Sequence, residues 1–215
     1  MVACPLLSAS TTKRSAEMNA ESLGNVQVLG SNLSNVLHAF GNFELLASRI
    51  MLDEGLGTES DQGVVQFEKD QWYPVTRWLA ALGRVGREYG EFVLGQAGLA
   101  VPKNAVFPPF VTDIDSALKS LDVAYHMNHC LGGTPMFSPD TGKMLEGIGH
   151  YGYAREADQK QITLECDTPY PCPFDSHLIQ AVAQRFESTA TVVHDTTRPC
   201  RKRGGSSCTY IVRWA

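Results

Sequence analysis

The 215-residue sequence contains few charged residues, no long apolar run and no excess of positive charge. No stretch reaches about 18 consecutive apolar residues, so no transmembrane helix is expected. Asp and Glu number 23 against 18 Lys and Arg, and the net charge of −5 argues against a general nucleic-acid-binding protein, which is usually basic. The composition, 43% hydrophobic and 19% charged, is typical of a globular protein.

The common catalytic and phosphate-binding signatures are also missing. We find no Gly-x-Ser-x-Gly, no His-Glu-x-x-His and no P-loop. Gly147-Ile-Gly-His-Tyr-Gly152 has the letters of the dinucleotide-binding fingerprint, but it precedes a polar turn and a strand instead of opening a helix, so small residues on a strand explain it better. No basic residue precedes the short apolar patch near the N-terminus. We therefore expect no signal peptide and a cytoplasmic, reducing location.

Apolar spacing predicts helices first and strands later. We expect helices from Ser31 to Gly41, over Phe43–Gly55, over Trp72–Val93, over Asp115–Asn128 and over Asp175–Phe186. We expect strands over Val64–Phe67, Ile148–Ala154, Gln161–Cys166, Thr189–His194 and Cys208–Trp214. The predicted fold class is α+β, with N-terminal helices packed on a mostly antiparallel sheet and one interrupting helix near the C-terminus. Residues 1–22 are expected to form a mobile tail, and residues 23–215 a single ligand-binding domain.

The longest predicted helix is interrupted by Gly83, Gly86 and Gly90. Each glycine costs up to about 1 kcal/mol relative to alanine in a helix. Tight packing against another helix explains this better than close approach of a ligand, although both remain open.

Four of the six cysteines lie near the C-terminus, at Cys166, Cys172, Cys200 and Cys208. A Gly-Gly-Ser-Ser tip before the last strand predicts a hairpin with Cys200 and Cys208 at its neck. Two facing thiols of this kind could bind one zinc ion. The spacing alone also allows buried small hydrophobes or disulfides.

The cysteine that opens a helix, the strand after it and C-x7-C on a closing hairpin together resemble the 4-vinyl reductase domain. That ligand-binding module is related to the Golgi-transport TRAPP subunits and, distantly, to haem-nitric-oxide-binding (H-NOX) domains. The matching residues are Cys172, the helix Asp175–Phe186, Cys200 and Cys208. The resemblance implies a structural zinc held by these three cysteines. Thr197 stands where the family has a glutamate ligand, so the fourth ligand is Cys166, His194 or Asp195, with Cys166 taken first.

Haem is not expected from the sequence. The haem-propionate motif of H-NOX domains, Tyr-x-Ser-x-Arg, was not identified, and His38, the one early histidine, lies on or near an apolar helix stripe. The cofactor that the resemblance implies is structural zinc.

The leading functional hypothesis is a small-molecule-binding sensory or adaptor protein. Its pocket is expected between the long helix and the sheet, where aromatic walls suit a small apolar or aromatic ligand. The expected ligand-binding residues are Trp72, Trp78, Tyr89, Phe92, His126, His129 and Tyr151. The resemblance implies a homodimer, and a sensor without an output domain needs a separate signalling partner.

Two other hypotheses remain. His126 and His129, three residues apart, could join His150 in a metal site or in acid–base chemistry, which would make the chain a metal- or tetrapyrrole-dependent enzyme. Helix-end histidines bonded to backbone carbonyls are the simpler interpretation, and the sequence identifies no partner carboxylate. An assembly protein like the TRAPP subunits would instead show a large exposed apolar patch.

A basic cluster accompanies the predicted hairpin neck. It consists of Arg198, Arg201, Lys202 and Arg203. Such a run could bind an anionic partner, but it is more often a solvated face. Neighbouring cations also lower the pKa of thiols.

Overall fold

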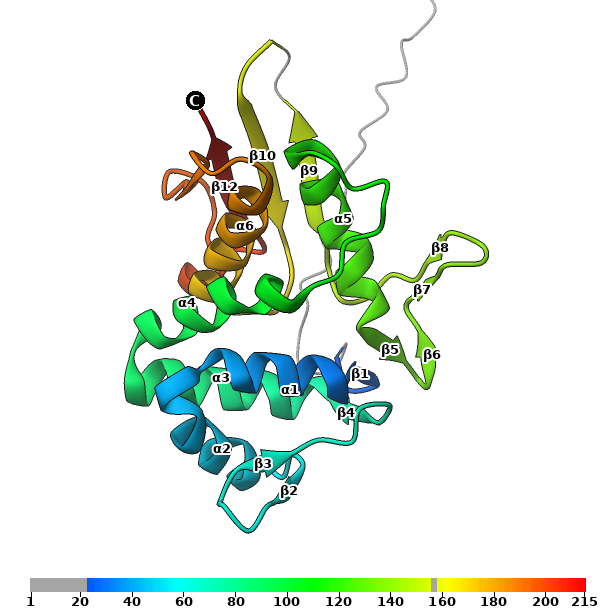
Figure 1. The fold of residues 1–215 in the computed structure, drawn as a ribbon, viewed down its shortest axis with the longest axis vertical. Helices are drawn as coiled ribbons and strands as arrows, with labels where there is room; N and C mark the ends of the chain where they lie inside the picture. The colour runs from blue at the N-terminus through cyan, green and yellow to red at the C-terminus, as the bar shows by residue number, and fades with distance from the viewer. Residues whose placement is uncertain (1–22, 156–157) are drawn as a thin grey trace, which may run out of the picture.

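The computed structural model describes residues 23–155 and 158–215 (Figure 1). The predicted tail, residues 1–22, lies outside the described residues. The N-terminal half is mainly helical. Its elements are β1 (Val26–Leu29), α1 (Gly30–Ala39), the 3-10 helix η1 (Gly41–Phe43), α2 (Glu44–Asp53), β2 (Thr58–Glu59), β3 (Val65–Gln66), β4 (Trp72–Pro74), α3 (Val75–Tyr89), α4 (Glu91–Ala100) and η2 (Val101–Asn104).

The C-terminal half alternates helices with short strands. It comprises α5 (Ile114–Met127), β5 (His129–Leu131), β6 (Thr134–Pro135), β7 (Phe137–Ser138), β8 (Lys143–Met144), β9 (Tyr151–Arg155), β10 (Gln161–Cys166), α6 (Cys172–Phe186), β11 (Thr191–His194), η3 (Arg201–Arg203) and β12 (Cys208–Arg213). Asp113 caps α5 through a capping box with Ser116. None of the helices within the described ranges combines the length and apolarity that crossing a membrane requires.

Two four-stranded sheets, ordered β4-β1-β5-β6 and β11-β12-β10-β9, contain only antiparallel neighbours. Helices α5 and α6 pack beside each other, α5 against β9 and α6 against β11 and β12 (Figure 1). Helix α4 crosses α6 and connects it to α1 and α3. The fold class predicted from the sequence, α+β, is confirmed, although the described strands form two four-stranded sheets and two small two-stranded ones, β2-β3 and β7-β8, instead of a single sheet.

The close crossing of α4 and α6 depends on small residues. A Cβ atom added at Gly98 would lie 2.4 Å from the carbonyl oxygen of Phe174, so only glycine lets the two backbones approach this far. The sequence expectation of tight helix packing therefore applies, but at a glycine of α4 that the sequence analysis did not single out.

Several predicted element boundaries are wrong for local reasons. The predicted long helix breaks at Gly90, whose φ of 92° separates α3 from α4. Helix α6 begins at Cys172, so Asp175 lies inside its first turn instead of capping it. Phe43 and Leu46, which lie at helical spacing at the start of the predicted helix Phe43–Gly55, are 39% and 42% exposed. Strand β1, which pairs with β4 on one side and β5 on the other, was not predicted, because it is four residues long and directly precedes a helix.

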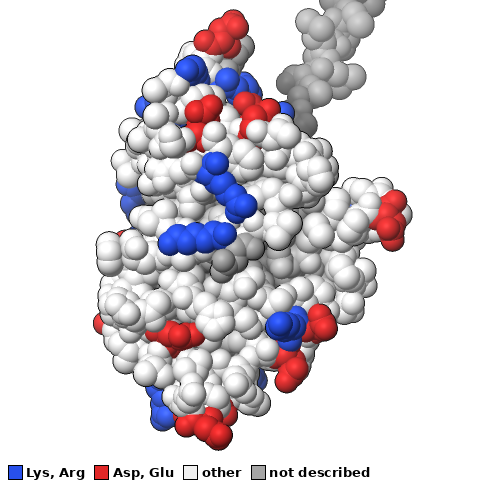
Figure 2. Space-filling view, viewed as in Figure 1, with Lys and Arg blue, Asp and Glu red and all other residues white. Residues whose placement is uncertain are grey.

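The surface on the face in Figure 2 is mostly uncharged, with acidic and basic side chains scattered over it. This agrees with the low content of charged residues, 19%. No single charged face on this side identifies a macromolecular partner.

Candidate functional site

The buried histidine at the end of α5 has one ring nitrogen without a hydrogen-bond partner. His126 is 0% exposed, and its Nδ1 lies 2.8 Å from the carbonyl oxygen of Asp122, one turn earlier. Nδ1 therefore carries the proton and donates to this carbonyl, which leaves a lone pair on Nε2. Within the part of the chain that the structure describes, no group hydrogen-bonds to Nε2. Metal-binding histidines have this arrangement, because the bond at the far nitrogen fixes the tautomer and the ring.

His150, just before β9, lies beside His126. Their ring centroids are 4.9 Å apart. His150 Nδ1 lies 3.0 Å from Asp122 Oδ2, and its Nε2 lies 2.9 Å from Glu146 Oε2. Burial lowers the pKa of His150, but the hydrogen bonds to Glu146 and Asp122 outweigh burial, so the pKa is raised overall. The structure thus supplies carboxylate partners that the sequence analysis missed. Asp122 could have been found from its position four residues before His126, on the same helix face.

His129 has a separate environment, although the sequence grouped it with His126 and His150. Its Nδ1 donates to the Tyr125 carbonyl at 2.7 Å, and its Nε2 lies 2.9 Å from the Tyr170 hydroxyl. Burial lowers the pKa of His129 to about 4. Among the described residues, the histidine-containing cluster whose donor atoms lie within 4.8 Å of one another consists of Asp122, His126 and His150, without His129. The three-histidine set expected for an enzyme is therefore not assembled.

Aromatic side chains from α5, β9 and the loop before α6 pack together in the core. The ring centroid of Tyr125 lies 5.4 Å from that of Tyr151 and 5.9 Å from that of Tyr170. The Tyr125 hydroxyl donates to the Ile148 carbonyl at 2.7 Å. Tyrosine, which buries a large apolar ring and one polar atom, suits such a core.

The predicted ligand-binding residues do not all meet in this core. Four are buried, two are partly buried and one lies at the surface. In that order they are Trp78, His126, His129 and Tyr151, then Trp72 and Tyr89, then Phe92. Phe92 lines a different cavity, beside α6.

Strand β9 carries a variant of the haem-propionate motif that the sequence analysis did not identify. Tyr151, Tyr153 and Arg155 have the spacing of Tyr-x-Ser-x-Arg, with Tyr153 in place of serine. Alternate residues of a strand share one face, so these three side chains do. The Tyr151 hydroxyl donates to Asp175 Oδ1 at 2.5 Å, and Arg155 Nε lies 3.2 Å from Asp115 Oδ1. A motif search that allowed one substitution would have found them.

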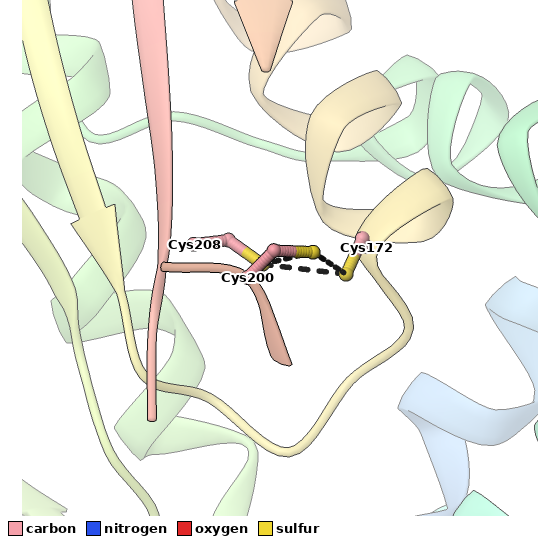
Figure 3. Close-up of side chains that lie close together, drawn as sticks. All are labelled: Cys172, Cys200 and Cys208. Atoms are coloured by element: carbon pink, nitrogen blue, oxygen red, sulfur yellow. Dashed lines mark hydrogen bonds between the residues drawn. The ribbon is translucent and has the colours of Figure 1, made fainter. Parts of the chain in front are cut away.

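Three thiols converge where α6 begins (Figure 3). Cys172 Sγ lies 3.3 Å from Cys208 Sγ and 3.9 Å from Cys200 Sγ, and the sulfurs of Cys200 and Cys208 are 3.8 Å apart. All three side chains are buried, and their sulfurs are close enough to contact one ion. The structure thus brings together the three cysteines that the resemblance singled out, and their role as metal ligands stays a prediction.

Among the described residues, no fourth ligand joins this thiol cluster. Cys166 lies opposite Cys208 in the antiparallel pairing of β10 and β12. In the described ranges, however, the cysteines whose sulfurs are close enough to share a metal ion are Cys172, Cys200 and Cys208, without Cys166. Asp195 accepts hydrogen bonds from Thr197, and the ring of His194 packs on Tyr210 with centroids 4.9 Å apart.

Arg201 connects the thiol cluster to a buried carboxylate. Its Nε lies 3.4 Å from Cys208 Sγ, and its Nη2 lies 2.6 Å from Asp175 Oδ2. Asp175 is 0% exposed and also accepts from Thr168 at 2.7 Å. Hydrogen bonds from Cys172 and then from Arg201 hold the pKa of the Cys208 thiol well below its ordinary value. The sequence predicted this effect of the basic cluster, and Arg201 provides it.

Comparison with solved structures identifies the fold. An H-NOX protein from S. oneidensis in the Fe(II)NO ligation state is 14% identical over 87% of this chain and 99% of its own, with a TM-score of 0.58. An H-NOX structure from work on heme distortion is 11% identical over 86% and 94%, with a TM-score of 0.56. An oxygen-binding H-NOX domain related to soluble guanylate cyclases is 14% identical over 86% and 94%, with a TM-score of 0.53.

No protein-family model matches the chain, and no curated protein matches it. The specific resemblance to the 4-vinyl reductase domain therefore gains no support, whereas the distant relation to H-NOX agrees with the structural neighbours. The cofactor prediction, structural zinc without haem, is contradicted, because solved proteins with this architecture are H-NOX domains studied with Fe(II) and heme. At these identities the likeness establishes one conclusion: the chain has the H-NOX fold.

Proposed function

We propose that this chain is a small-molecule-binding sensory module that would hold haem, with His126 as the residue that would bind its iron. One observation carries the proposal: His126 presents a buried Nε2 lone pair without a partner in the described residues, while its Nδ1 is fixed by the Asp122 carbonyl. This donor fits haem iron, for which imidazole is a common axial ligand. The neighbouring solved proteins support the choice of cofactor, because they are H-NOX proteins. When bound, haem held by this histidine would supply an iron at which a diatomic gas could bind.

The residues of β9 would contact the acidic edge of the haem. Tyr151 and Arg155 occupy the outer positions of the motif variant, and each already binds a carboxylate, Asp175 and Asp115 respectively. A hydroxyl and a guanidinium that bind carboxylates in the protein are also suitable donors to haem propionates. Binding would exchange these internal partners for the propionates.

Room for the macrocycle would come from the aromatic core. Tyr125 packs against both Tyr151 and Tyr170, so a planar tetrapyrrole would need these rings to separate. Haem binding should therefore change the near-ultraviolet circular dichroism of the tyrosines. A free surface site for haem would leave that signal unchanged.

The test is titration of the full chain with haem, followed by visible absorption and near-ultraviolet circular dichroism. We expect one equivalent to bind with a Soret band typical of histidine ligation. His126→Gly should lose this band, and added imidazole should restore it by replacing the missing ring. His38→Ala is the matched control, because the His38 side chain is 68% exposed. Binding that is equal in wild type and His126→Gly, or no binding, would refute the proposal.

The remaining functional expectations accompany this proposal. We propose that the module works as a homodimer in the cytoplasm and passes its signal to a separate partner. Size-exclusion chromatography with light scattering, with and without haem, tests the first point. A monomer under both conditions would remove the dimer from the proposal.

A further inference from the structure

A cavity of about 630 Å³ lies beside the beginning of α6, between α4 and the residues around η3. Its volume is in the range of small-molecule sites. Phe92 and Pro173 contribute apolar lining, and Cys172 and Cys200 place two of the clustered thiols in the lining. The core tyrosines and His126 do not line this cavity, so it is distinct from the proposed haem site.

Phe92 is a large apolar side chain that the protein leaves exposed at this cavity. The side chain lies at the cavity and is 73% exposed, although the neighbouring Val93 and Leu94 of α4 are buried. Covering a phenyl ring with an apolar group removes the ring from water and so lowers the free energy. An apolar molecule in the cavity would cover the face of Phe92 that the protein leaves open.

The charges around the cavity do not cancel. Lys202 forms an ion pair with Glu91, which neutralises both groups. Arg203 also lines the cavity, and its Nη2 donates to the carbonyl oxygens of Thr196 and Arg198 at 2.7 and 3.3 Å. These acceptors carry no charge, and no carboxylate of the described residues pairs with Arg203. One guanidinium therefore remains available to an anion at the cavity.

Two histidines add polar atoms to the lining. His177 Nδ1 donates to the Pro173 carbonyl at 2.8 Å, which leaves its Nε2 as an acceptor. His194 Nε2 is buried and has no hydrogen-bond partner in the described part of the chain. A few polar atoms in a largely apolar lining are the features that orient a small ligand.

We infer that this cavity binds a small molecule with an apolar body and one carboxylate. The apolar body lies against Phe92 and Pro173, and the carboxylate binds Arg203. Because Lys202 and Glu91 neutralise each other, the remaining charge at the cavity is the positive charge of Arg203. This charge favours an acid over a neutral molecule or an amine. The inference does not depend on haem, because no residue proposed to bind haem lines this cavity.

The test uses the full chain and two aromatic probes of the same shape, 1-naphthoate and uncharged 1-naphthamide, in calorimetric titrations. We expect saturable binding of the naphthoate and about tenfold weaker binding of the amide, which lacks the charge-assisted bond. Arg203→Gln should remove this preference, and Phe92→Ser should weaken both probes. Arg49→Gln changes an exposed arginine of α2 outside the cavity and should change neither.

The thiols supply an independent readout of occupancy. Saturating naphthoate should slow alkylation of Cys200, which lines the cavity, and leave Cys130 unaffected as an internal standard, because Cys130 is buried beside Gln27. His126→Gly should bind naphthoate normally, which separates this site from the proposed haem site. The inference is overturned if naphthoate does not saturate, if amide and acid bind equally, or if variants with unchanged thermal unfolding retain the preference after Arg203→Gln.

Discussion

His129 illustrates how one buried side chain makes stability depend on pH. Burial lowers the pKa of His129 to about 4, against 6.5 for an unperturbed histidine. Below pH 6.5 His129 binds a proton in the unfolded chain but stays neutral in the native protein. Its contribution to stability is therefore fully present above pH 6.5 and is lost as the pH falls toward 4. The loss should amount to about 3 kcal/mol at most. Urea denaturation at a series of pH values measures it.

His129→Gln separates this contribution from the carboxylates that also titrate at acidic pH. The variant keeps a group that can hydrogen-bond near Tyr170 but does not titrate. Its stability should therefore fall less between pH 6.5 and pH 4 than that of the wild type. An identical pH profile for the two proteins would show that His129 binds its proton equally well in the native and unfolded chains.

At the scale of elements, helices α4 and α6 pack closely where they cross, and both contribute residues to the cavity lined by Phe92 and Cys172. Gly98→Ala puts a methyl group 2.4 Å from the Phe174 carbonyl and 3.1 Å from the Leu178 nitrogen, both of them backbone atoms. Because neither atom can rotate away, we expect a loss of about 1–3 kcal/mol in unfolding free energy. Differential scanning calorimetry measures the effect.

Gly83→Ala is the matched control for this prediction. Its new Cβ would meet only the end of the flexible Arg87 side chain, at 3.2 Å. Alanine is the better helix former, so this change should be neutral or should stabilise the protein by up to about 1 kcal/mol. If both variants behaved alike, the close approach of α4 and α6 would not be what requires glycine at position 98.

At the scale of the whole molecule, the buried pair of Asp175 and Arg201 connects α6, β9 and the residues before β12. Asp175 also accepts from Tyr151 and Thr168, so four separate segments meet at one carboxylate. Removing the Arg201 guanidinium leaves the buried Asp175 carboxylate without the opposite charge that pairs with it. Arg201→Met should therefore cost about 3–5 kcal/mol of unfolding free energy.

The control for this prediction is an exposed ion pair that also joins an arginine to an aspartate. Arg49 pairs with Asp53 on α2, where the arginine side chain is 72% exposed. Arg49→Met should cost less than about 1 kcal/mol, because water screens such pairs. Equal costs in chemical denaturation would indicate that Asp175 is protonated or hydrated in the native protein.

Local sequence patterns determined much of the fold and part of the site. Apolar periodicity located α1, α2, α3, α5 and α6, and alternation located β10 and β12, because helix and strand periods are local properties of the chain. The hairpin spacing also predicted that Cys200 and Cys208 would be neighbours. It did not predict the break at Gly90, because a single glycine can equally continue a helix.

The tertiary structure alone decided which side chains meet across long sequence separations. It placed His150 beside His126 and paired Asp175 with Arg201, and it kept His129 apart by bonding it to Tyr170. Periodicity cannot give these contacts, because they depend on how α5 packs against β9 and α6. The same packing produced the H-NOX fold and left Nε2 of His126 without a hydrogen-bond partner among the described residues, and neither feature can be obtained from local sequence patterns.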